Sequence, residues 1–109
     1  MRLRRWSIAL VSVLSAIATI VPAQAAGDAA AGRKLVVQCQ ACHGLDGKAK
    51  IPEAPNLAGQ SEPYLAKALG DYKAGARQNE MMSLVAPKLS DQDIADLAAY
   101  YAGLAEAGN

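Results

Sequence analysis

Three stretches of the chain carry apolar residues at the three- and four-residue spacing of an amphipathic helix. They cover 28–38, 61–75 and 90–104, and each begins at an Asp or Ser, the residue types that cap helix N-termini. In the third, Ser90 and Asp93 form a capping box in which Asp replaces the usual Glu. No stretch shows the strict alternation of a half-buried strand. The pattern therefore predicts an all-α protein built from three main helices.

The segments between these helices are predicted to be loops. Residues 44–60 contain three glycines and two prolines and have no periodicity. Residues 76–88 form a second loop with one helical turn, ended by Pro87. Gly32 lies on the apolar face of the first helix, where a glycine costs up to about 1 kcal/mol relative to alanine. It is either a tolerated glycine or a point where another helix approaches closely.

The first 25 residues are predicted to be a secretory signal peptide. Three arginines precede an apolar run over 8–21, and Ala-Gln-Ala at 23–25 fits the small residues of a cleavage site. An uncleaved membrane anchor is the weaker alternative, because a membrane-spanning helix needs about 20 apolar residues. We expect cleavage before Ala26, export to the periplasm without a permanent membrane anchor, and a mature domain covering 26–109.

The composition limits what this domain can do. The whole chain has 109 residues, enough for one small domain. Its 11 basic and 10 acidic residues give a net charge of +1, whereas nucleic-acid binding requires a strong basic excess. Two cysteines and one histidine cannot complete a zinc site. Without the signal segment, four tyrosines are the whole aromatic content. Because so few large side chains are available for a hydrophobic core, we expect a bound group to fill the centre of the domain.

The sequence Cys39-Gln40-Ala41-Cys42-His43 carries the chemistry of the chain. C-x-x-C-H is the attachment signature of c-type haem: each thiol forms a thioether with one vinyl group, and the adjacent histidine is held under the iron as its proximal ligand. A thioredoxin-like redox pair would follow a strand in a βαβ unit, a zinc half-site would need further ligands, and a structural disulfide would leave His43 without a role. The motif predicts one haem c, attached through Cys39 and Cys42 with His43 on the iron.

The sixth position on the iron is either open or filled by a second ligand. Thioether sulfur is one of the usual haem ligands, and the predicted mature chain has two methionines, Met81 and Met82. Methionine is commonly a core filler, but this pair lies in a polar loop rather than on an apolar face. The two neighbours are therefore the candidates for the second axial ligand.

In order and spacing, these features resemble the class I c-type cytochromes. The similarity is to the small bacterial periplasmic monohaem type, close to a single domain of the c-four-type cytochromes, and it covers 26–104. It rests on the segments Gly27–Gly32, Cys39–Gly44, Ala54–Gln60, Tyr64–Leu65, Lys73–Gly75, Met81–Met82 and Leu89–Tyr101. The resemblance implies the class I fold, in which three main helices and their loops wrap around one covalently bound haem.

The resemblance also implies roles for individual residues. The interval to the Leu-Ser-Asp cap of the last helix favours Met82 over its neighbour as the iron ligand. The carbonyl of Pro55 is expected to accept a hydrogen bond from Nδ1 of His43, which fixes the orientation of the ring. Gly32 is expected to admit the ring of Tyr100 where the first and last helices cross. Candidates to bond the haem propionates are Tyr64, Tyr72, Arg77 and Asn79.

The ligand count and the resemblance together imply an electron carrier. With His43 and Met82 both on the iron, no coordination site is open to a substrate, which favours one-electron transfer over enzymatic catalysis. We expect a monomer that exchanges electrons with redox protein partners in a respiratory chain. The alternative is a haem c subunit of a larger oxidoreductase complex. For docking we expect an apolar ring around the haem edge, with weak steering by charge, formed by Ala41, Ile51, Met81, Val85, Ala86 and Pro87.

Overall fold

The described part of the chain contains helices and loops and no strand. The computed structural model describes residues 17–18 and 26–106, so the predicted signal peptide lies outside the described residues except at positions 17 and 18. Within these ranges no helix is long and apolar enough to cross a bilayer. The predicted all-α class is confirmed. In chain order the elements are α1 Ala29–Leu35, η1 Val36–Gln38, α2 Gln40–His43, α3 Glu62–Ala74, α4 Met82–Val85, η2 Ala86–Lys88 and α5 Asp91–Ala102.

The three main helices, α1, α3 and α5, are bounded largely by the residues that the sequence predicts. Side chains of Asp28 and Ser61 each accept a backbone N–H of the first turn of their helix. Gly75 ends α3 with a φ of 78°, in the left-handed region that favours glycine. The capping box forms, because the Asp93 N–H donates to Oγ of Ser90 at 3.0 Å and the Ser90 N–H donates to Oδ2 of Asp93 at 2.9 Å.

Two helical segments differ from the prediction. The first helix does not continue as an α-helix to residue 38, because it tightens into the 3₁₀ turn η1 at Val36. The adjacent β-branched residues Val36 and Val37 lower the local α-helical propensity, and Val36 is fully buried. The second loop holds both α4 and η2, and Pro87 lies inside η2 rather than ending a turn. Proline is tolerated there because a first-turn N–H needs no partner within the helix.

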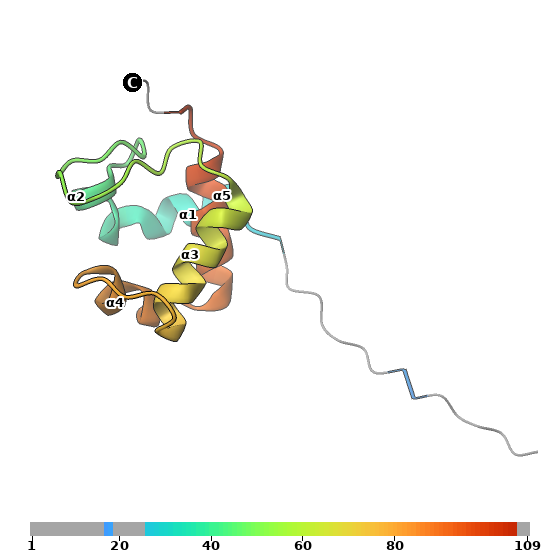
Figure 1. Cartoon of the computed structure of the whole chain (residues 1–109). Helices are drawn as coiled ribbons and strands as arrows, with labels where there is room; N and C mark the ends of the chain where they lie inside the picture. Colours follow the sequence, from blue (N-terminus) through green and yellow to red (C-terminus); the bar gives the residue numbers. More distant parts are fainter. Residues whose placement is uncertain (1–16, 19–25, 107–109) are drawn as a thin grey trace, which may run out of the picture.

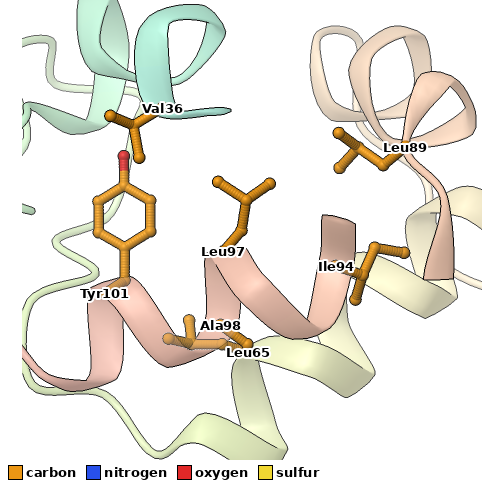
Figure 2. Close-up of a cluster of buried hydrophobic side chains, with 7 residues drawn as sticks. All are labelled: Val36, Leu65, Leu89, Ile94, Leu97, Ala98 and Tyr101. Carbon is orange, nitrogen blue, oxygen red and sulfur yellow. The ribbon is translucent and has the colours of Figure 1, made fainter. Parts of the chain in front are cut away.

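Helix α5 is the centre of the fold. It packs against α1 and against α3, as Figure 1 shows. In Figure 2 its side chains point into one buried cluster, with Tyr101 and Leu97 on the side of Val36 and with Ile94 on the side of Leu89. The cluster is small, consistent with the poor aromatic content. It consists of Val36, Leu65, Leu89, Ile94, Leu97, Ala98 and Tyr101.

The crossing of α1 and α5 requires a glycine at position 32. A Cβ built on Gly32 would lie 2.1 Å from the carbonyl oxygen of Asp96 and 2.9 Å from Cβ of Tyr100. Gly32 therefore marks a close approach of two helices, and it admits chiefly the backbone of α5. The expected partner Tyr100 does lie at this crossing through its Cβ, and its hydroxyl donates to the carbonyl oxygen of Leu45 at 2.5 Å, in the loop after α2.

Candidate haem site

The residues of the C-x-x-C-H motif lie on one short helical turn. Cys39 follows η1 and donates its N–H to the carbonyl of Val36 at 2.8 Å, and α2 begins at the next residue. The N–H of His43 donates in turn to the carbonyl of Cys39 at 2.9 Å. Residues three and four positions apart share one face of such a turn. Both thiols and the imidazole therefore come from a single piece of backbone that is anchored to the core through Val36.

His43 is oriented by a backbone carbonyl from the following loop. The residue is 9% exposed, and its Nδ1 lies 2.9 Å from the carbonyl oxygen of Pro55. A carbonyl can only accept, so Nδ1 must be the donor. Nε2 then keeps its lone pair, which is the form of imidazole that binds a metal ion.

The surroundings of His43 fit a haem ligand. Nε2 makes no hydrogen bond with the described residues, and none of their buried side-chain nitrogen or oxygen atoms lacks a partner. Because Nε2 has no partner among the described residues, it cannot be one of the fully buried atoms and must be accessible from outside the core. One ring nitrogen is fixed by the protein and the other is free to coordinate, and two thiols lie on the same turn. This donor set is the one that covalent haem attachment requires.

The loop after α2 brings Pro55 to this position through its own hydrogen bonds. The N–H of Lys50 donates to the carbonyl of Cys42 at 2.8 Å, and the N–H of Leu57 donates to the carbonyl of Gly47 at 2.8 Å. Gly47 has a φ of 72°, and a Cβ there would lie 2.6 Å from the backbone nitrogen of Ala58. The path of the loop, and with it the place of the Pro55 carbonyl, thus depends on the absence of a side chain at position 47.

The two cysteines do not have the character of a redox-active dithiol. Both are free thiols and both are partly buried. Burial raises the pKa of the Cys39 thiol to about 11, whereas redox-active C-x-x-C pairs carry a cysteine with a lowered pKa. No strand precedes the motif in the part of the chain that the structure describes. Both observations disfavour the thioredoxin-like alternative.

The two methionines differ in burial and in their place in the fold. Met81 is 58% exposed, whereas Met82 is half-buried and is the first residue of α4. Met82 thus begins a short helical turn inside the segment that the sequence predicts to be a loop with one such turn. Oδ1 of Asn79 accepts the N–H groups of both, at 2.9 Å from Met81 and 3.1 Å from Met82. Sequence reasoning missed this role of Asn79, although an Asn just before a helical turn is a recognisable capping signal.

Three of the four candidates for bonding a propionate are neighbours, with Tyr64 and Tyr72 on α3 and Arg77 just after it. The guanidinium carbon of Arg77 lies 4.8 Å from the centre of the Tyr72 ring, and the neighbouring Tyr64 side chain raises the pKa of Arg77. The fourth candidate, Asn79, uses its carbonyl oxygen on the backbone of α4 instead. A fixed positive charge beside two aromatic rings is the stronger candidate group for a carboxylate.

Two hollows on the surface of the described residues lie away from the motif. One of about 370 Å³ lies between Arg33, Lys50 and Tyr100. The other, of about 610 Å³, lies between the end of α3 and α4 and is lined by Tyr72, Lys73, Ala74, Gly75, Gln78, Asn79, Glu80, Ser83 and Pro87. The functional assignment of His43 and the two cysteines therefore depends on their chemistry and geometry and not on the shape of either hollow.

The predicted apolar docking ring needs one correction. Ala86 is 0% exposed and is part of the core, so it cannot contact another protein. Ala41, Ile51, Met81 and Pro87 are exposed, and Val85 is partly exposed. Further apolar side chains flank the candidate ligands in sequence and are strongly exposed among the described residues. They are Val37 at 70% and Leu84 at 64%.

An all-α domain whose C-x-x-C-H turn offers an oriented imidazole and two free thiols defines a c-type haem protein. The comparison with protein families agrees: the profile of the cytochrome c family matches residues 29–105. The chain belongs to the cytochrome c family, and its cofactor is covalently attached haem c. The similarity to class I and to the c-four-type domain is confirmed.

Individual relatives define the similarity more closely. Cytochrome c4 of Pseudomonas aeruginosa is 50% identical over 85% of this chain and 46% of its own length. Cytochrome c-554(548) of Halomonas halodenitrificans is 49% identical over 70% of this chain and 95% of its own length. The crystal structure of reduced cytochrome c4 from Pseudomonas stutzeri matches with a TM-score of 0.69 at 45% identity, over 73% of this chain and 47% of that one. The chain thus spans about half the length of the cytochrome c4 relatives.

Proposed function

We propose that this protein carries single electrons, through a haem c attached to Cys39 and Cys42 whose iron is bound by His43 and Met82. The observation that carries the proposal is the 2.9 Å contact between Nδ1 of His43 and the carbonyl oxygen of Pro55. It leaves Nε2 as the unprotonated nitrogen and fixes the plane of the ring. When bound, a c-type haem supplies one-electron redox chemistry at its iron.

The residues of the chain keep this geometry fixed. Tyr100 and Tyr101 of α5 donate their hydroxyls to the carbonyls of Leu45 and Gly44, the two residues after His43. The proximal side is therefore tied to the central helix as well as to Pro55. A site that changes little between its oxidised and reduced forms suits electron transfer, because little rearrangement accompanies each electron.

Met82 is the better of the two methionine candidates for the distal side. It is the less exposed of the pair, and it begins a helical turn whose C-terminal neighbour Ala86 is fully buried. Met81 points more of its side chain into solvent. With protein ligands on both faces of the iron, no position remains for a substrate, so we propose a carrier and not an enzyme. Met/His ligation also raises the reduction potential.

The exposed apolar side chains near the site support the same proposal. Val37 lies two residues before the first cysteine, and Met81 and Leu84 flank the distal ligand. Large apolar side chains that stay exposed beside a candidate site suit a surface that a bound group covers. A haem held between the C-x-x-C-H turn and α4 would cover such side chains and would supply the core volume that the small cluster around α5 lacks.

The location and the partners belong to the proposal as well. Residues 1–25 have the sequence of a secretory signal peptide, so we place the mature protein in the periplasm, where it would exchange electrons with protein donors and acceptors as a monomer. The Halomonas relative, which this chain covers almost completely, supports a domain of this size acting alone. The alternative is a haem c subunit of a larger oxidoreductase complex, and the greater length of the cytochrome c4 relatives favours it.

Mass spectrometry and visible spectroscopy of the exported protein test the proposal. The intact mass after denaturation should equal residues 26–109 plus one haem, and the ferric spectrum should contain the methionine charge-transfer band. Carbon monoxide should bind the reduced protein slowly, because Met82 must leave first. A mass without haem would refute the attachment, and rapid binding of carbon monoxide would refute the closed site. Purification as a free protein of this mass would exclude the subunit alternative, whereas co-purification with larger chains would support it.

A further inference from the structure

The segment that carries Met82 is poorly anchored by burial. Every residue from Ala74 to Met81 is exposed, and α4 contains no buried residue. An isolated helix of this length is unstable in water, because the first turn costs more conformational entropy than its few hydrogen bonds return. The first fully buried residue after α3 is Ala86. The placement of Met82 must therefore depend on something other than apolar packing on its N-terminal side.

Asn79 and Ser83 supply that anchor through reciprocal hydrogen bonds. The N–H of Asn79 donates to Oγ of Ser83 at 2.9 Å, and the N–H of Ser83 donates to the carbonyl of Asn79 at 3.0 Å. Oδ1 of Asn79 accepts the N–H groups of Met81 at 2.9 Å and Met82 at 3.1 Å. Four hydrogen bonds thus close a small ring of backbone and side chains around the residue that binds iron.

We infer that Asn79 and Ser83 are positioning residues that hold Met82 on the iron and so set how often the methionine dissociates. This inference rests on the proposed function, because it requires Met82 to be the distal ligand. When Met82 leaves the iron, its sulfur and the start of α4 must move away. The hydrogen bonds of Asn79 and Ser83 oppose that movement, because Oδ1 of Asn79 holds the backbone N–H of Met82 itself and Asn79 is in turn held by Ser83.

The test measures how readily carbon monoxide replaces the methionine in the reduced, haem-loaded protein. Asn79→Ala removes the acceptor for two N–H groups and should raise the rate of carbon monoxide binding by about three- to thirtyfold, the factor that corresponds to the loss of a helix cap. Ser83→Ala should act in the same direction. Asn79→Asp and Ser83→Thr keep the acceptor oxygens and should bind carbon monoxide as slowly as the unmodified protein.

A matched control separates positioning from general destabilisation. Ser90→Ala removes a cap of the same kind from α5, where Ser90 bonds Asp93 and not the segment of Met82. It should lower stability and leave the rate of carbon monoxide binding unchanged. Equal rates in Asn79→Ala and the unmodified protein would overturn the inference, and so would an equal increase in Ser90→Ala.

The same series distinguishes failure of the inference from failure of the proposed function. If the unmodified protein already binds carbon monoxide rapidly and has no methionine charge-transfer band, the closed His/Met site is wrong. If that band is present and is lost in Met82→Ala, but Asn79→Ala retains slow binding, the proposed function stands and only the positioning role falls.

Discussion

The hydroxyl of Tyr101 donates to the carbonyl oxygen of Gly44 at 3.3 Å, across 57 positions of sequence. This bond joins the central helix α5 to the residue that directly follows His43. Tyr101 is buried, and burial raises the pKa of its hydroxyl, so it stays a neutral donor throughout the physiological range. The proximal side of the site is in this way tied to the core cluster of the fold.

Removal of that hydroxyl should weaken the protein measurably. Tyr101→Phe keeps the ring in the core but leaves the buried Gly44 carbonyl without its donor, which should cost about 1 kcal/mol of the free energy of unfolding. Denaturant unfolding of the haem-loaded protein measures the change. A free energy of unfolding equal to that of the unmodified protein would contradict the role of the Tyr101 bond.

A methyl group at position 32 should disrupt the crossing of α1 and α5. Gly32→Ala would place Cβ 2.1 Å from the carbonyl oxygen of Asp96, so the helices must separate, at a cost of about 1–3 kcal/mol or more in the free energy of unfolding. Gly70→Ala in α3 is the control. Nothing lies within 4 Å of the position that its Cβ would take, and alanine should stabilise that helix by up to about 1 kcal/mol. Thermal unfolding of both variants should give shifts of opposite sign.

The two methionines should differ sharply when each is replaced. Met82→Ala should remove the methionine charge-transfer band of the ferric protein, lower the reduction potential and open the iron to carbon monoxide. Met81→Ala should leave all three properties close to those of the unmodified protein, because the Met81 side chain is largely exposed. A normal ferric spectrum for Met82→Ala would assign the ligand to Met81.

Charge should contribute little to association with redox partners. Lys50 pairs with Asp46 at 3.3 Å, and both side chains are about half exposed, so this pair presents little net charge to a partner. The rate of electron transfer to the natural partner should fall by less than about tenfold between low and physiological salt. A larger fall would show steering by charge, and Lys48→Ala would then slow the reaction at low salt.

Most of the features that the sequence predicts correctly depend on residues that are close together in the chain. The apolar spacing indicates the three main helices, and the caps at Asp28, Ser61 and Ser90 indicate their starts, because periodicity and capping involve residues only a few positions apart. The C-x-x-C-H motif is equally local. Its five residues on one turn are sufficient to identify covalent haem, since the attachment chemistry depends on their spacing.

Patterns among neighbouring residues are less reliable at the end of the first helix and in the second loop. Periodicity predicts the first helix as one piece, yet it tightens at Val36, because burial of this side chain in the core outweighs continuation of the α-helix. The second loop is predicted to hold one turn, and it contains α4 and η2, whose short hydrogen-bonded turns carry no apolar periodicity. The capping of this turn by Asn79 is not predicted, because without apolar periodicity the sequence does not indicate where the turn begins.

By itself, the sequence determined the helices, the cofactor and the two candidates for the distal ligand. Only the tertiary structure decided that Gly32 faces the backbone of Asp96, and that Tyr100 and Tyr101 bond the carbonyls after His43. These partners are far apart in sequence and meet because α1 packs across α5. Their pairing depends on the angle and depth of that crossing, which is set by the summed packing of the buried cluster and leaves no trace in the spacing of neighbouring residues.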